Sequence, residues 1–139
     1  MMRNPEQTIG NLISKCGLCA VASIDSDGFP NIKEMYAPAE REGIKTFLFS
    51  TNTSSRRTRQ FLTNPKAAVY FHDRRFFRGV QLIGIMEVLT DSDTKELVWR
   101  EGNEKYYPLG VTDPDYCVLR FTAIKGRYYS NFKSEDFDV

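Results

Sequence analysis

A run of hydroxyl side chains that ends in two arginines is the strongest chemical signal in the sequence. It reads Ser50-Thr51-Asn52-Thr53-Ser54-Ser55-Arg56-Arg57 and lies where a predicted strand ends and a predicted helix begins. Backbone N–H groups in the first turn of a helix attract anions, and hydroxyl and guanidinium groups add directed donors. The run is suited to binding one phosphate group. The alternative is an ordinary capped helix with a solvated basic face.

Lys33 is a second candidate for the same chemistry, because it follows Pro30 on a predicted strand of the same meander. Its ammonium group could meet the phosphate across the sheet, or it could face water. The sequence contains neither a Gly-x-x-x-x-Gly-Lys-Ser/Thr loop nor a Gly-x-Gly-x-x-Gly loop, so the common nucleotide-binding loops are absent. Any phosphate site must therefore be of another kind.

The sequence contains few residues that could bind a metal ion or carry out thiol chemistry. Cys16 and Cys19 form a Cys-x-x-Cys pair at the end of a predicted helix, with no second pair to complete a zinc site. A redox dithiol usually opens a helix, so we expect these two residues to be buried, structural thiols and expect no metal site. His72 is the single histidine, which excludes a His-rich metal site, and no Gly-x-Ser-x-Gly elbow is present.

The elements that must position these residues can be read from periodicity and turn signals. Cap residues and helical spacing predict helices over residues 5–16, 55–62 and 93–100. Apolar or alternating runs predict strands over residues 18–24, 31–36, 44–50, 66–72, 80–90 and 116–124, with 126–132 continuing the last. Residues 40–43 are interpreted as a polar turn and residues 134–139 as an acidic tail. Gly84, in the middle of a strand, indicates a bulge or a close backbone approach.

These elements predict one domain over residues 1–139. The fold class is mostly β with peripheral α: a six-stranded antiparallel barrel with helices on its outside. The chain has 139 residues, which fits one domain with a core of its own. With 19 Lys plus Arg against 18 Asp plus Glu, the net charge is +1, which argues against a surface that grips nucleic acid or an anionic membrane.

The expected compartment is the cytoplasm. No apolar run approaches the ~20 residues that span a bilayer, and no apolar signal core follows the N-terminus. Three cysteines, an odd number, fit a reducing environment. Aromatic residues gather late in the chain, where they could fill a core, line a flat ligand, or stack single-stranded nucleic acid on a small barrel. The near-zero net charge weighs against the last alternative.

The order of these motifs resembles the pyridoxamine 5′-phosphate oxidase-like flavoprotein superfamily, whose members share the FMN-binding split barrel. The resemblance is carried by the segment from Phe49 to Phe61, which contains the Ser-Ser-Arg-Arg run, and by Asn64-Pro65-Lys66-Ala67-Ala68-Val69. The chain is more closely similar to the short bacterial branch of general stress or nitroimidazole-resistance-like proteins. Gly79-Val80-Gln81-Leu82-Ile83-Gly84, Lys105-Tyr106-Tyr107-Pro108 and the segment from Asp113 to Leu119 fit that branch.

The resemblance implies FMN as the cofactor and names the residues that would hold it. By position, they are Lys33, Glu34 and Met35 beside the flavin, Ser50 and Thr51 at the ring and ribityl chain, Ser55, Arg56 and Arg57 around the phosphate, and Gln81 near a flavin-contacting glutamine. The family commonly has arginine where Lys33 stands and lysine where Arg57 stands. Both exchanges keep the charge and change the hydrogen-bond geometry.

The resemblance also implies a homodimer with FMN at the subunit interface. The partner subunit would then contribute aromatic residues, with Tyr106, Tyr107, Tyr128 and Phe132 as candidates. The expected function is an FMN-dependent oxidoreductase acting on an unidentified small molecule, with no catalytic residue assigned. Vitamin B6 synthesis is not expected, because 139 residues leave little room for the longer C-terminal motifs of the vitamin-oxidising members. The alternatives are a flavin- or haem-binding storage or sensor protein, and a nucleic-acid-binding barrel without FMN.

Overall fold

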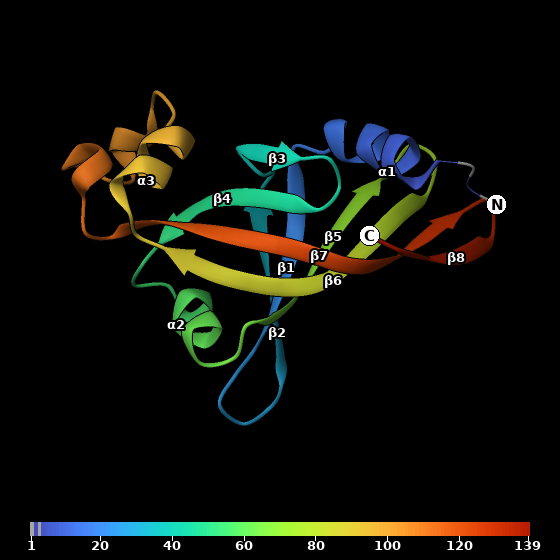
Figure 1. The fold of residues 1–139 in the computed structure, drawn as a ribbon, viewed down its shortest axis with the longest axis horizontal. Helices are drawn as coiled ribbons and strands as arrows, with labels where there is room; N and C mark the ends of the chain where they lie inside the picture. The colour runs from blue at the N-terminus through green and yellow to red at the C-terminus, as the bar shows by residue number, and fades with distance from the viewer. Residues whose placement is uncertain (1, 3) are drawn as a thin grey trace.

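Strands dominate the computed structural model, which describes residue 2 and residues 4–139 (Figure 1). The elements are α1 (Pro5–Ser14), β1 (Leu18–Ile24), β2 (Pro30–Tyr36), β3 (Glu40–Glu42), β4 (Thr46–Asn52), α2 (Arg56–Thr63), β5 (Lys66–Asp73), β6 (Arg78–Leu89), α3 (Ser92–Val98), β7 (Tyr116–Ser130) and β8 (Lys133–Asp138). Two short 3-10 helices, Asn103–Lys105 and Gly110–Thr112, lie between α3 and β7. The mostly β, antiparallel class expected from the sequence is confirmed.

One antiparallel sheet contains all eight described strands in the order β2-β1-β5-β6-β7-β4-β3, with β8 paired to β7. The long strand β7 organises this sheet, because its first half pairs with β4 and its last residues pair with β8. Its register with β6 shifts between Ile83 and Gly84. A Cβ atom at Gly84 would collide with the backbone carbonyl of Thr122. Both readings of this glycine, a bulge and a close backbone approach, are therefore confirmed.

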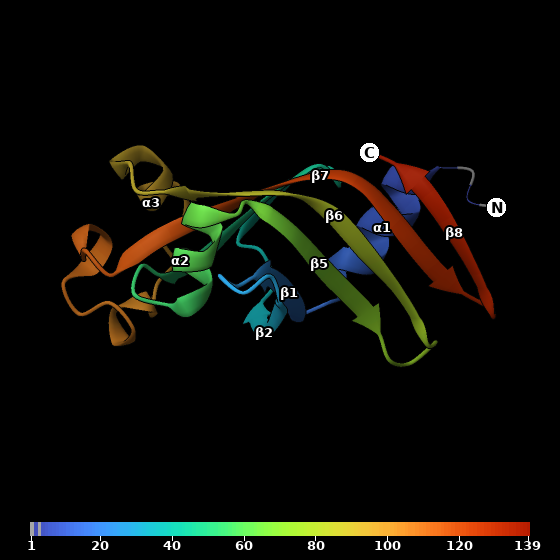
Figure 2. The ribbon, with the colours of Figure 1, turned by 90° about the horizontal axis from the view of Figure 1, so that it is seen from below.

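Two hydrophobic clusters stabilise the sheet. The larger one fills the barrel and contains the buried aromatic side chains of Phe47, Phe49, Phe71 and Phe121. The ring centroid of Phe47 lies 5.9 Å from that of Phe71 and 6.0 Å from that of Phe121. The smaller one contains Val98, Tyr107, Tyr116 and Val118 and lies under α3. Figure 1 shows α3 and the 3-10 helices at one end of the molecule, and Figure 2 shows the β5–β6 and β7–β8 hairpins reaching the other end.

The prediction of six strands was wrong, since the described residues form eight. Residues 40–42, read as part of a turn, form the short strand β3 against β4. Residues 133–138, read mainly as an acidic tail, form β8 against β7, and β7 itself continues to Ser130. Both missed strands are rich in charged residues because they lie at sheet edges, where charge discourages pairing with other chains. Such strands lack the apolar alternation on which the sequence reading depended.

The helices begin where the sequence indicated. The Asn4 side chain accepts a hydrogen bond from the Gln7 amide at 3.2 Å, and the Ser55 hydroxyl accepts one from the Thr58 amide at 3.3 Å. These bonds satisfy amides that a helix leaves free in its first turn. The helix α2 therefore starts at Arg56, directly after the hydroxyl-rich run. Within residues 2 and 4–139, no helix has both the length and the apolar character needed to cross a membrane.

Candidate functional site

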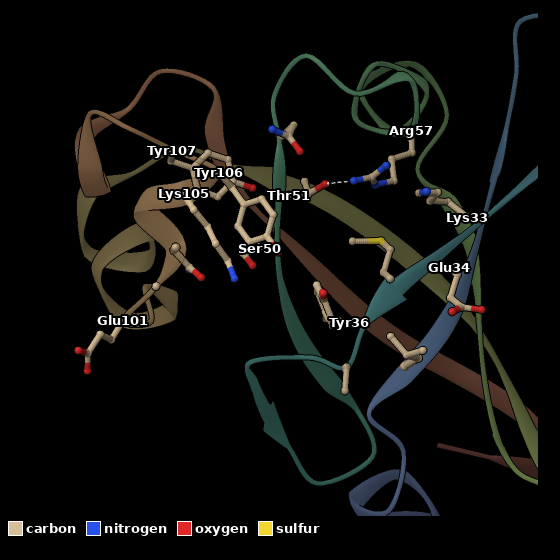
Figure 3. A pocket seen from close by; sticks show the side chains of 16 residues that line it. Lys33, Glu34, Tyr36, Ser50, Thr51, Arg57, Glu101, Lys105, Tyr106 and Tyr107 are labelled. Carbon is tan, nitrogen blue, oxygen red and sulfur yellow. Dashed lines mark hydrogen bonds between the residues drawn. The ribbon is translucent and has the colours of Figure 1, made fainter.

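A cavity of about 780 Å³ opens between β2, the end of β4, the start of α2 and the segment that follows α3 (Figure 3). Its size lies within the range of small-molecule and cofactor sites. Its lining residues are Leu18, Lys33, Glu34, Met35, Tyr36, Ala37, Ser50, Thr51, Asn52, Arg57, Glu101, Gly102, Asn103, Lys105, Tyr106 and Tyr107. Six of the nine residues named from the sequence are among them.

Arg57 is a partly buried cation in the lining of this cavity. Its Nη2 atom donates a hydrogen bond to the Thr51 hydroxyl at 2.5 Å, while its Nε–H group is buried without an acceptor. Within the described part of the chain, no carboxylate forms an ion pair with Arg57. Burial lowers the pKa of Arg57, which shows that the guanidinium has lost part of its hydration. A partly dehydrated cation with a spare donor is suited to an anionic ligand.

Asp115 fixes the loop that leads into α2. Its carboxylate accepts hydrogen bonds from the Ser54 amide at 2.8 Å and from the Asn52 side chain at 3.0 Å, and its backbone carbonyl accepts one from the Thr53 amide at 2.7 Å. The bonds from Asn52 and Ser54 lower the pKa of Asp115. The start of β7 therefore holds the end of β4 and positions the first turn of α2, which carries Arg57.

The three neighbours on β2 do not share one environment. In the pairing of β1 with β2, Lys33 lies opposite Val21 and Met35 opposite Cys19, and these partners are buried in the barrel. Glu34 lies on the other face of the strand. Figure 3 shows Lys33 directed to the side of the cavity that holds Arg57, whereas the carboxylate of Glu34 points away from it.

Ser55, Arg56 and Gln81 do not line this cavity. The Ser55 side chain caps α2, and Arg56 follows it as an exposed residue. Gln81 lies on β6 and lines a separate cavity of about 390 Å³ beside β7 and β8. The structure therefore distinguishes the two adjacent arginines, since Arg57 reaches the cavity and Arg56 does not.

An exposed face of the sheet borders the cavity; we call it the outer face. It contains side chains of β1, β2, β5 and β6 that strand pairing places on one side: Leu18, Ile32, Glu34, Tyr36, Tyr70, Gln81 and Ile83. The apolar members are between 38% and 75% exposed. Since Leu18, Glu34 and Tyr36 also line the cavity, the cavity opens onto this face.

Tyr36 and Lys105 were missed as site residues on this chain. The alternation of β2 places Tyr36 on the face opposite to Lys33, so the strand pattern alone argues against a shared site. Lys105 ends the short 3-10 helix Asn103–Lys105, in a stretch whose sequence has no periodic signal. Tyr106 and Tyr107, expected to act from a partner subunit, line the cavity of their own chain, and Tyr128 is buried in the main core. Phe132 is 95% exposed.

The cysteines are free thiols. The Cys16 Sγ donates to the Leu12 carbonyl at 3.3 Å and to the His72 carbonyl at 3.4 Å, and Cys19 and Cys117 are buried. Burial raises the pKa of Cys19 to about 12. Within residues 2 and 4–139, no three His, Cys, Asp or Glu side chains are grouped so that they could hold a metal ion.

Comparison with known proteins gives one matching family, described as pyridoxamine 5′-phosphate oxidase, over residues 5–130. A crystal structure from Clostridium acetobutylicum, of a protein related to general stress protein 26 of Bacillus subtilis and assigned to the pyridoxinephosphate oxidase family, is 37% identical. It covers 100% of this chain and 97% of its own, with a TM-score of 0.89. This likeness confirms the split-barrel fold.

Two further matches cover a smaller part of the relative's own length. The pyridoxine/pyridoxamine 5′-phosphate oxidase of Rhizobium leguminosarum bv. trifolii is 35% identical over 74 residues, which is 53% of this chain and 35% of that enzyme. The chain thus matches about a third of the length of such curated relatives. A haem-binding protein from Mycobacterium smegmatis shares the fold, with a TM-score of 0.78 at 12% identity, over 99% of this chain and 59% of its own.

Proposed function

The chain belongs to the pyridoxamine 5′-phosphate oxidase family, and on this basis we propose that it binds FMN and uses it to oxidise or reduce a small molecule. The observation that carries the proposal is Arg57. It is a partly dehydrated guanidinium in the cavity, with one donor fixed by Thr51 and another without a partner. A phosphate group would give that donor an acceptor and the charge a counter-ion.

The residues of the cavity fit the parts of FMN. Arg57 and Lys33 would hold the phosphate at the start of α2, where free helix amides also favour an anion. Ser50 and Thr51, at the end of β4, would meet the ribityl chain, and the buried side chain of Met35 offers an apolar surface to the ring. Bound FMN supplies hydride or electron transfer, while the protein positions the cofactor and controls the field around it.

We include a homodimer in this proposal because of the outer face. Its apolar residues, among them Ile32 at 75% exposure and Tyr70 at 42%, form a surface that a second copy can cover. Since the cavity opens onto this face, the second copy would close it and shield it from water. Gln81 lies on the same face, away from the cavity of its own chain, so it would approach FMN only from the partner subunit.

Vitamin B6 oxidation is not part of the proposal. The curated enzymes with that name match this chain over about a third of their own length, so their substrate cannot be transferred with the match.

The visible absorption spectrum of freshly purified protein tests the proposal. A flavin spectrum, with FMN released on denaturation and identified by chromatography, supports it. If the protein is colourless, titration with FMN followed by flavin fluorescence decides the question, and absence of binding at micromolar FMN overturns the proposal. A haem spectrum with no flavin would instead favour the haem-binding alternative.

A further inference from the structure

The side chain of Gln60 joins α2 to the hairpin of β1 and β2. We infer that Gln60 is a positioning residue: it holds α2 against this hairpin and so sets the separation of Arg57 and Lys33, the two cations proposed above to hold one phosphate. The inference rests on the proposed binding of FMN. Figure 3 shows the two cations on the same side of the cavity, Arg57 from α2 and Lys33 from β2.

Gln60 bridges two residues that face each other across the strands. Its Oε1 atom accepts a hydrogen bond from the Ser23 hydroxyl at 2.5 Å, and its Nε2 atom donates to Oδ1 of Asn31 at 3.5 Å. Ser23 on β1 and Asn31 on β2 are register partners, so one amide connects the helix to both strands. We call these three residues the Gln60 clamp. Ser23 is 4% exposed, so its hydroxyl depends on a protein partner for a hydrogen bond.

The turn between β1 and β2 fixes the orientation of the Asn31 amide. Its Nδ2 atom donates to the Asp25 carboxylate at 3.0 Å and to the Phe29 carbonyl at 3.1 Å. The bond from Asn31 lowers the pKa of Asp25, which therefore stays charged near neutral pH. Since both donors of the Asn31 amide are used, its Oδ1 atom is left to accept from Gln60.

The Gln60 clamp lies next to each cation along the chain. Asn31 and Lys33 are two residues apart on β2, so their side chains leave the same face of the strand. Gln60 follows Arg57 by three residues, which is close to one turn of α2. A contact between Gln60 and Asn31 therefore fixes the side of β2 that carries Lys33 against the side of α2 that carries Arg57.

Within the described part of the chain, no other side-chain hydrogen bond joins α2 to β1 or β2. The side chains of Arg57 and Thr58 bond to β4 instead. Among the described strands β2 pairs with β1 alone, at the end of the sheet order. A strand with a single neighbour is held by fewer contacts and can shift more easily. Because two cations bind one phosphate only at a defined separation, the link through Gln60 matters for the site.

The test is a double-mutant cycle, read as the ratio of FMN affinity to riboflavin affinity in flavin fluorescence titrations. Gln60→Leu should lower this ratio roughly three- to tenfold, because Lys33 no longer lies at the separation from Arg57 that one phosphate requires. Lys33→Met alone should lower it roughly tenfold or more. In the Lys33→Met background, Gln60→Leu should leave the ratio unchanged, since the lysine that Gln60 positions is gone.

Two single variants accompany the cycle. Ser23→Ala removes one bond of the Gln60 clamp with a smaller change in the side chain. It should lower the ratio about twofold or more, and it keeps the inference testable if Gln60→Leu does not fold. Asn4→Ala is the matched control, because it removes a side-chain hydrogen bond at the start of α1, outside the cavity lining. The ratio should not change in this control.

An unchanged ratio in both Gln60→Leu and Ser23→Ala overturns the inference. A further fall when Gln60→Leu is added to Lys33→Met also overturns it, because Gln60 would then act without Lys33. An equal fall in Asn4→Ala would assign the effect to lost stability, with the same consequence. Failure of the proposed function is a different result: wild-type protein that binds no FMN at micromolar concentration removes that proposal and this inference together.

Discussion

Arg57, in the first turn of α2, donates from Nη2 to the Thr51 hydroxyl at the end of β4, 2.5 Å away. This bond links the two elements on either side of the hydroxyl-rich loop and orients a guanidinium that keeps a second, unpaired donor.

Arg57→Ala should weaken FMN binding roughly ten- to hundredfold, because a hydrogen bond to a charged partner contributes about 1.5–3 kcal/mol. The affinity for riboflavin, which has no phosphate, should fall much less. Fluorescence titration of both flavins measures the contrast. Arg56→Ala is the matched control, since Arg56 is exposed and does not line the cavity. Equal losses for FMN and riboflavin would mean that Arg57 shapes the cavity without binding phosphate.

Thr51→Val should weaken FMN binding roughly five- to tenfold, about the contribution of one hydrogen bond. Valine keeps the volume of the buried threonine and removes the acceptor that orients Arg57. Any contact of the lost hydroxyl with the ribityl chain is common to FMN and riboflavin, so it does not change the ratio of the two affinities. Thr51→Val should also lower the ratio of the affinity for FMN to the affinity for riboflavin. An unchanged ratio in the same titration would show that Arg57 finds the phosphate without the help of Thr51.

Asp115→Asn should lower the free energy of unfolding by about 1 kcal/mol near neutral pH, since a charged acceptor of two hydrogen bonds becomes a neutral one. The pKa of Asp115 is lowered in the folded protein, so its contribution is complete above the ordinary pKa of about 3.9 and is lost as the pH falls through the folded value. Urea unfolding between pH 3 and 7 should therefore show the two proteins converging at the acidic end. If the two free energies of unfolding differ by the same amount at every pH, the effect of the substitution does not come from the charge of the carboxylate.

Light scattering at micromolar concentration should give a mass of twice 16.0 kDa. Ile32→Lys, at the most exposed apolar residue of the outer face, should weaken association roughly a hundredfold, because it buries an unpaired charge. Leu97→Lys on α3 is the control, with a comparable exposed side chain outside that face. A wild-type mass of one chain would contradict the proposed interface.

Cys19 should resist alkylation in the folded protein. Its side chain is 3% exposed, and burial raises its pKa to about 12, so at pH 8 almost no reactive thiolate exists. Iodoacetamide followed by mass spectrometry should label Cys19 only after unfolding in urea. Stoichiometric zinc that disappears when Cys16 and Cys19 are both changed to Ser would instead show that the pair is a metal site.

Much of the fold could be predicted because the strands that form the barrel carry apolar alternation and the helices carry caps. Asn4 and Ser55 mark their helix starts, and Gly84 marks the bulge. The strands β3 and β8 could not be predicted in the same way. Their charged residues face solvent at sheet edges, and only the neighbouring strand makes them extended.

The candidate site was predictable in part for a similar reason. The Thr51 and Arg57 pair lies within one local motif, where strand end and helix start follow each other in the sequence. Tyr36 and Lys105 line one cavity only through the tertiary fold, because they come from an edge strand and a short 3-10 helix 69 positions apart in the numbering. No local pattern connects them, and strand alternation places Tyr36 on the face opposite to Lys33.

The separation of the two cores affects how such a protein can diverge. The segment that carries Lys105 and Tyr106 packs on the cluster of Val98, Tyr107, Tyr116 and Val118, whereas the barrel depends on the larger cluster around Phe47 and Phe121. Replacement of the segment between β6 and β7 by a homologous one would change one side of the cavity while the barrel and α2 stay as they are. Grafting that segment between relatives is therefore a way to alter the cavity without disturbing the main core.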